Sequence, residues 1–158
     1  MAKRKTKNLK IKNVISFSIL LLGIASLVTL FLPVVYIDGL QTVYTGLQIS
    51  MGHTVSTVSG IVQTKVFDFS IMNTLTYALA IVGIAFFVLG GLGKGTKFAT
   101  LISALAFLAS GALFFMQNTL CLPSFIPINL IHLSYGAYVG AITAILAGIL
   151  SLSKLVIK

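Results

Sequence analysis

The feature that most constrains this chain is the length of its uncharged segments. No Asp, Glu, Lys or Arg occurs over the 56 residues from Phe98 to Ser153, and two earlier segments of 25 residues, Asn13–Ile37 and Phe69–Gly93, are equally free of charge. One helical pass across a bilayer needs about 20 apolar residues, because a helix rises about 1.5 Å per residue and the hydrocarbon layer is about 30 Å thick. The two shorter segments therefore hold one pass each, and the long segment holds two.

These lengths predict an all-α membrane protein whose single domain is a four-helix transmembrane bundle. Hydrophobic residues make up 58% of the chain and charged residues 8%, whereas soluble domains contain about 45–50% and about 25%. We expect the membrane domain at residues 14–152, a mobile basic tail at 1–13 and a second tail at 153–158. The spans are expected at residues 14–35, 71–92, 98–116 and 135–152.

Basic residues are concentrated on one predicted side of the membrane. Ten of the 11 Lys and Arg residues precede the first span, lie between the second and third spans, or follow the fourth; only Lys65 lies in an opposite loop. The positive-inside rule assigns the lysine-rich side to the cytoplasm. Because four passes return the chain to its starting side, we expect both termini in the cytoplasm and outer loops at 36–70 and 117–134.

The first outer loop has the residue pattern of short strands. Val34–Ile37 is followed by Asp38-Gly39, a dipeptide that suits a two-residue hairpin turn. Three more runs in this loop are expected to be strands: Leu40–Tyr44, His53–Val58 and Ile61–Phe67. We therefore expect a small β-containing extracellular loop. The second connector, 119–134, is too apolar for open water, and we expect it on the membrane surface or against the outer sheet.

A stripe of small residues runs along the fourth span. Gly136, Gly140, Ala144 and Gly148 follow one another at four-residue spacing, so they share one helix face. In lipid, helices associate through close packing of such faces. Packing inside the bundle and dimerisation through the fourth span are both open from sequence. For the first of these, the third span offers Ser103, Ala106, Ala109, Ser110 and Gly111.

Residues that could perform catalysis or bind a metal or cofactor are few and scattered. The only acidic and imidazole side chains are those of Asp38, His53, Asp68 and His132, and no two have the close spacing that puts ligands on one helix face. The lone Cys121 has no second cysteine with which to form a redox pair. We therefore expect no enzyme activity, no catalytic residue, no metal and no cofactor.

The predicted spans have no ionisable residue at their centres, which argues against proton-coupled exporters and carriers of charged substrates. Their polar side chains can bond to their own helix or to a neighbour; they are Thr29, Asn73, Thr74, Thr76, Tyr77, Thr100, Ser103, Ser110 and Thr143. The basic tail lacks the aromatic platform that nucleic-acid binding uses. We interpret the tail as a determinant of orientation and expect no nucleic-acid partner.

The order of elements resembles that of the claudins: one span, a long β-prone outer loop, a tightly turned pair of spans with a short second outer loop, and a last span. Tyr44-Thr45-Gly46-Leu47-Gln48 is similar to the Gly-Leu-Trp portion of that family's signature, although this chain has no Trp and no pair of loop cysteines. Phe31-Leu32-Pro33, the same loop segment and Gly52 also resemble small bacterial four-pass membrane proteins of uncharacterised function. This second resemblance implies a bacterial plasma membrane.

These features together predict a small multi-pass integral membrane protein without enzyme activity. We expect a structural or accessory subunit that acts through helix–helix contacts and through its outer loop, Tyr36–Phe69. Its expected partners are the lipid bilayer and either further copies of the chain or a larger membrane complex. The alternative is an oligomeric pore or carrier for neutral or lipid-like solutes, and a third hypothesis is a holin-like role in lysis.

Overall fold

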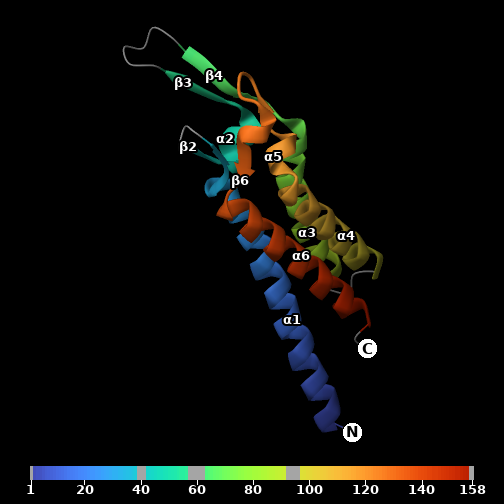
Figure 1. The fold of residues 1–158 in the computed structure, drawn as a ribbon. Coiled ribbons are helices and arrows are strands. Elements are labelled where there is room, and N and C mark those ends of the chain that lie inside the picture. The colour runs from blue at the N-terminus through green and yellow to red at the C-terminus, as the bar shows by residue number, and fades with distance from the viewer. Residues whose placement is uncertain (1, 39–41, 57–62, 92–96, 157–158) are drawn as a thin grey trace.

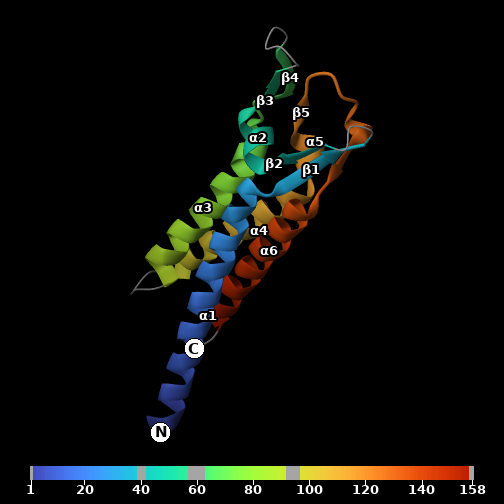
Figure 2. The same ribbon diagram turned by 90° about the vertical axis from the view of Figure 1, so that its left-hand side faces the viewer.

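Four long helices form a bundle, and short strands gather at one end of it (Figures 1 and 2). The computed structural model describes residues 2–38, 42–56, 63–91 and 97–156. The long helices are α1 (Ala2–Val28), α3 (Ile71–Gly91), α4 (Lys97–Phe115) and α6 (Tyr135–Val156). Each contains a segment long and apolar enough to cross a membrane. The helical bundle predicted from the uncharged segments is confirmed.

Aromatic rings that pack directly against glycines hold the four helices together. Helices α1 and α4 each pack against α3 and α6. The fully buried ring of Phe107 lies 2.9 Å from the position that a Cβ would take on Gly23 of α1, and equally close to that of Gly83 on α3. Because a glycine has no side chain, the ring can touch both backbones. Phe87 and Phe114 are also fully buried.

The first helix differs from the prediction at both ends. It begins at Ala2, so the basic tail that we expected to be mobile forms the first turns of α1, which project beyond the other helices in Figure 1. Lysine and arginine are good helix formers, and they continue a helix already nucleated by the span. The helical segment apolar enough to cross a membrane ends at Phe31 and not at residue 35, because Pro33 starts a strand.

Two three-stranded antiparallel sheets cover the end of the bundle. One has the order β2-β1-β6, formed by Thr42–Thr45, Pro33–Ile37 and Ile131–Leu133, and the other has the order β3-β4-β5, formed by His53–Ser56, Gln63–Asp68 and Leu122–Pro123. Each sheet combines strands from the first connector with a strand from the second. The second connector therefore lies against the sheets, one of the two arrangements expected. We call residues 32–38, 42–56, 63–70 and 116–134 the cap.

The register of the first strand pair differs from the predicted hairpin. Ile37 lies opposite Thr42, so the connection runs over residues 38–41 and is longer than a two-residue turn. Asp38 follows β1 directly. Gly39, the second residue of the predicted turn, lies outside the described residues, as do residues 57–62 and 92–96.

Two short helices complete the cap, α2 (Gly46–Met51) and α5 (Gln117–Leu120). Helix α2 starts with a capping box: the Gln48 backbone N–H donates to the Thr45 hydroxyl, and the Thr45 N–H donates to Gln48 Oε1 over 2.9 Å. The cap and the start of α6 share one hydrophobic core, made of Val34, Val35, Ile37, Tyr44, Ile49, Phe67, Cys121, Ile131 and Ala137.

Candidate functional site

The small-residue stripe of α6 is used inside the bundle. A Cβ added to Gly140 would lie 2.6 Å from Cε1 of Phe114, and one added to Gly148 would lie 2.7 Å from Cγ of Leu108, both on α4. At Gly136 the added carbon would meet the carbonyl oxygen of Pro33. Ala144 is fully buried. The stripe therefore packs against α4 and the start of β1. Lateral contacts with other molecules have to use other faces of the bundle.

We expected the serines of α4 to face the stripe on α6. Two of them instead bond to α3. The Ser103 hydroxyl donates to the Gly83 carbonyl and the Ser110 hydroxyl to the Thr76 carbonyl, each over 2.7 Å. Other span hydroxyls donate to carbonyls of their own helix, namely those of Thr29, Thr74, Thr76 and Thr143. These hydroxyls therefore have backbone hydrogen-bond partners within the protein.

A buried cluster of polar side chains lies where the bundle meets the cap. We call it the polar junction; its members are Thr29, Ser50, Ser70, Asn73, Tyr77 and Gln117. Ser70 is its structural centre, because its hydroxyl donates to the Leu120 carbonyl over 2.6 Å and its N–H donates to the Ser50 carbonyl over 3.1 Å. The start of α3 thus holds the last turn of α2 and the end of α5 in place.

Tyr77 links the same junction to the turn that follows the first helix. The Gln117 side-chain amide donates to the Tyr77 hydroxyl over 3.1 Å, and this hydroxyl is also bonded to the Thr29 side chain. Gly46 of α2 lies directly against the hydroxyl, with no room for a Cβ. The Tyr77 ring meets Phe114 edge to face, with centroids 5.2 Å apart. One phenol therefore contacts Thr29, just after the end of α1, together with α2, α4 and α5.

Three members of the junction have side-chain atoms without a hydrogen-bond partner among the described residues. They are both amide atoms of Asn73, Oε1 of Gln117 and the hydroxyl of Ser50. Asn73 and Gln117 are fully buried. A buried polar group left without a partner costs about 1–3 kcal/mol. Each buried polar group of this kind in a native protein therefore calls for a physical explanation.

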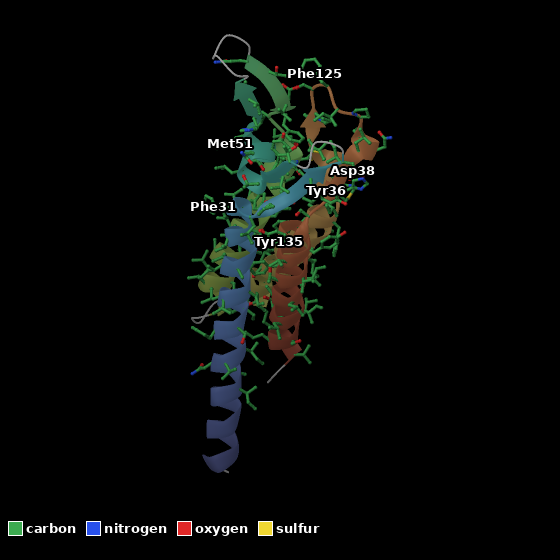
Figure 3. The ribbon with its side chains drawn as sticks, turned by 60° about the vertical axis from the view of Figure 1, so that its left-hand side comes forward. Phe31, Tyr36, Asp38, Met51, Phe125 and Tyr135 are labelled. Atoms are coloured by element: carbon green, nitrogen blue, oxygen red, sulfur yellow. The ribbon has the colours of Figure 1, made fainter. Side chains whose placement is uncertain are left out.

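The second connector presents an apolar face to the outside of the cap. The Phe125 side chain is 77% exposed, and Figure 3 shows it far from Tyr135, which marks the base of the cap. Further exposed apolar residues of this connector are Leu122, Ile128 and Leu130. Ile126 and Ile131 point the other way and pack on the cap core. We call Leu122, Phe125, Ile128 and Leu130 the connector face.

The acidic and imidazole residues of the cap form separate pairs. Nε2 of His132 lies 3.1 Å from Oδ2 of Asp38, and Tyr36 stacks on the same imidazole. His53 instead packs on the ring of Tyr44. Within the described part of the chain, no three His, Cys, Asp or Glu side chains are grouped so that they could hold a metal ion.

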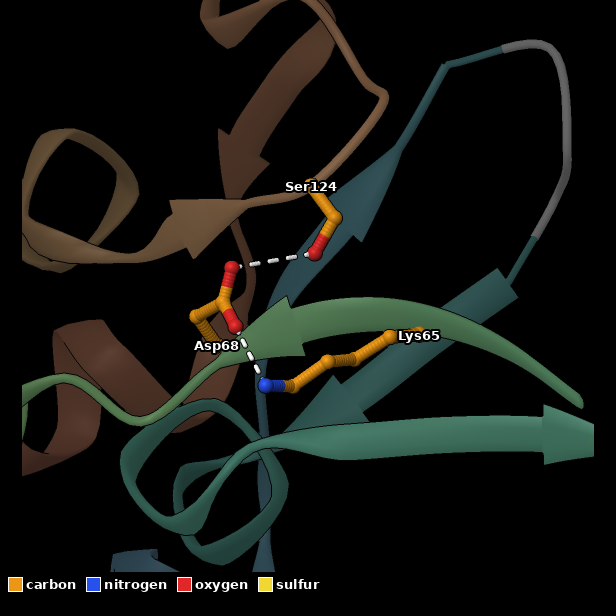
Figure 4. Close-up of polar contacts among 3 residues, drawn as sticks. All are labelled: Lys65, Asp68 and Ser124. Atoms are coloured by element: carbon orange, nitrogen blue, oxygen red, sulfur yellow. Dashed lines mark hydrogen bonds and ion pairs between the residues drawn. The ribbon is translucent and has the colours of Figure 1, made fainter.

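Asp68 is held by two neighbours on the cap surface (Figure 4). Nζ of Lys65 lies 2.5 Å from one carboxylate oxygen, and the Ser124 hydroxyl donates to the other over 3.1 Å. The bond from Lys65, followed by that from Ser124, lowers the pKa of Asp68 below its ordinary value. Lys65 and Asp68 both belong to β4, whereas Ser124 follows β5, so the bond from Ser124 joins the two connectors.

Cys121 is a structural residue of the cap core. Its side chain is buried, and its thiol donates to the Asn118 carbonyl over 3.0 Å. Burial raises the pKa of the Cys121 thiol to about 11, so it stays protonated near neutral pH. A protonated, enclosed thiol is a poor nucleophile.

Comparison of the chain with protein-family models, with curated proteins and with solved structures gives no match. The fold itself defines a class: a multi-pass helical membrane protein with four apolar helices. Its distinctive parts are the polar junction, which sequence reasoning did not assemble, and the connector face. The polar character of Asn73 and Tyr77 was visible in the sequence, but Gln117 reaches Tyr77 only because α5 packs against α3.

Proposed function

We propose that this chain is a plasma-membrane protein with both termini in the cytoplasm and the cap outside. The distribution of charge supports this orientation. Both acidic residues of the chain, Asp38 and Asp68, belong to the cap, whereas ten of its 11 Lys and Arg residues lie outside the cap. The positive-inside rule places the lysine-rich end in the cytoplasm.

Within that membrane we propose a non-enzymatic role as a structural or accessory subunit of a larger complex. The observation that carries this proposal is the connector face, where Leu122, Phe125, Ile128 and Leu130 are exposed on the cap. Two of the cap's strands, β5 and β6, hold this segment at both ends. Burying a rigid apolar surface against another protein is favourable and has little ordering cost. The proposed partner is the extracellular part of another membrane protein with an apolar patch of its own.

The claudin-like order of elements remains part of this proposal. What supports it is the sequence of parts: a span, a strand-bearing connector, two spans joined closely, a shorter connector and a last span. In this chain, β1 from the first connector pairs with β6 from the second. The cap is thereby assembled as one recognition unit, although the chain lacks Trp and a pair of loop cysteines.

An oligomeric pore for neutral or lipid-like solutes is the alternative. The packed rings of Phe87, Phe107 and Phe114 occupy the bundle interior, so any passage has to run between copies. Solute flux into liposomes that contain the purified protein distinguishes the two roles. The contact role predicts vesicles as tight as protein-free ones, whereas flux that depends on the amount of protein favours the pore.

Site-specific photocrosslinking in native membranes tests the contact role. The photoreactive p-benzoylphenylalanine replaces Phe125 in one variant and Thr64, an exposed polar residue of β4, in the matched control. We expect one discrete protein adduct from the Phe125 position, identified by mass spectrometry, and little or none from the Thr64 position. Equal labelling at the two positions, or lipid adducts alone at Phe125, would contradict a protein partner at the connector face.

A further inference from the structure

We infer that the polar junction is an internal water-binding site, anchored by the side-chain amide of Asn73. This inference is independent of the proposed function, since it concerns how the cap is joined to the bundle. It begins from two fully buried amides, Asn73 with both polar atoms unpartnered and Gln117 with its oxygen unpartnered. The side chains that form hydrogen bonds between α3 and α5, those of Ser70, Tyr77 and Gln117, are uncharged.

The hydrogen bonds of α5 place Gln117 against α3, and helix spacing places Asn73 on the same face of α3. Helix α5 is tied to α3 at two points: the Ser70 hydroxyl donates to the carbonyl of Leu120, and Gln117 donates to the hydroxyl of Tyr77. Asn73 lies between these points on α3, one turn after Ser70 and one turn before Tyr77. Residues three and four positions apart share a helix face. The Asn73 side chain is therefore directed toward α5, where Gln117 is.

The chemistry of the two amides selects an uncharged ligand. The free Asn73 amide offers two N–H donors and one acceptor, and the free oxygen of Gln117 offers a second acceptor. A bound cation would leave the N–H groups without an acceptor. A bound anion would be repelled by the two carbonyl oxygens. Water can donate two hydrogen bonds and accept two, and buried waters typically make about three bonds to otherwise unpartnered polar groups. Water therefore fits this set of donors and acceptors.

Such a site gives the junction a physical role. The bond from Ser70 and the bond to Tyr77 hold the ends of α5, and a water between Asn73 and Gln117 would join its first residue to the middle of the same α3 face. Helix α5 has four residues, too few to be stable alone. Its position under the second connector thus depends on bonds to α3, one of them mediated by water.

Solid-state NMR of the full chain in liposomes can detect this water directly. The chain has five Asn and four Gln residues, so selective ¹⁵N labelling of these side chains gives a small set of NH₂ signals. The Asn73 signal is the one lost in Asn73→Leu. We expect magnetisation transfer from water to the Asn73 and Gln117 amides, and a water-soluble paramagnetic chelate should quench the exposed Gln63 amide while sparing both. No transfer at Asn73 in the wild-type protein, or quenching equal to that of Gln63, overturns the inference.

A pair of variants on α5 separates bound water from general solvent entry. Gln117→Leu removes one of the two anchoring amides, and we expect it to lower the transfer from water to Asn73 several-fold. Asn118→Leu, at the next and partly exposed position, is the matched control and should leave the transfer unchanged. Equal transfer in both variants means that Gln117 does not help to bind the water, and it contradicts the proposed site. If Gln117→Leu fails to fold, the wild-type measurement decides alone.

Discussion

Tyr36 of β1 stacks on His132 of β6, with ring centroids 5.3 Å apart and an angle of 28° between the ring planes. Strand β1 follows the first long helix and β6 precedes the last one. These two helices also pack against each other in the bundle. The stack therefore closes a ring of contacts that joins the two ends of the chain's membrane part through the cap. A cap built in this way is held in a fixed position on the bundle.

The glycine stripe predicts a specific packing defect. Gly140→Val places a side chain where the Phe114 ring lies, because even a Cβ would be 2.6 Å from that ring. We expect a loss of about 1–3 kcal/mol of stability from overpacking, measured by denaturant titration in detergent micelles. Phe114→Leu in the same chain should recover part of the loss. Ala112→Val, at an exposed position of α4, is the control and should change little.

The same variant also discriminates between the two uses of the stripe considered from sequence. If the stripe were a dimer contact, Gly140→Val would change the oligomeric state and leave the stability of each bundle unaltered. We expect the reverse, a weakened bundle with an unchanged oligomeric state by analytical ultracentrifugation in detergent.

The bond from Ser110 to the Thr76 carbonyl predicts a modest, measurable contribution to helix association. Ser110→Ala removes a buried donor that bridges α4 and α3 over 2.7 Å. We expect it to lower the free energy of unfolding by about 0.6 kcal/mol, and at most about 1.7 kcal/mol, as for interhelical bonds in other membrane proteins. Thr143→Ala provides the comparison, because Thr143 bonds to its own helix at an exposed position. Equal effects of the two changes would refute an interhelical contribution.

The Asp68 contacts predict a stability that depends on pH. Lys65 and Ser124 lower the pKa of Asp68 below its ordinary value of 3.8. Because the folded state binds the proton less tightly, the stabilisation is present above pH 3.8 and is lost as the pH falls from there through the lowered pKa. Melting curves at a series of pH values should show this loss in the wild-type protein. Asp68→Asn should lack that component, and wild-type and variant curves that stay parallel on acidification would disprove it.

The buried cysteine predicts a slow reaction with thiol reagents. Since burial raises the pKa of Cys121 to about 11, the reactive thiolate is scarce near neutral pH, and the cap core also blocks access. We expect maleimide to label the folded protein far more slowly than the protein unfolded in detergent. Thr64→Cys in a Cys121→Ser background serves as the exposed reference and should react quickly. Similar rates for Cys121 and Cys at position 64 would contradict the enclosed environment.

The helices were predictable because their cause is local. An uncharged apolar run of sufficient length has few stable states in lipid other than a helix. The ends of the helices were less predictable. Pro33 and the β-branched residues after it start β1 although the apolar run continues. Helix α2 did have a sequence signal, the Thr45-x-x-Gln48 capping box, which the strand pattern around it obscured.

The contacts that define the site depend on distant parts of the chain. The pairing of β1 with β6 brings together segments from opposite ends of the sequence, and no local periodicity encodes it. Likewise, Phe107 fits against Gly23 and Gly83 only once three helices are in place. Asn73 was recognised as a polar residue in a span, but its burial without a partner depends on α5, a helix too short to be recognised from sequence.

The most direct test of the central claim, four membrane-crossing helices with the cap outside, is cysteine labelling in intact cells. Single cysteines at Thr64 in the cap and at Lys97 at the start of α4, each in a Cys121→Ser background, are exposed to a membrane-impermeant maleimide. The account predicts that position 64 is labelled in intact cells and position 97 only after the membrane is permeabilised. Labelling of position 97 in intact cells, or protection of position 64, would contradict it.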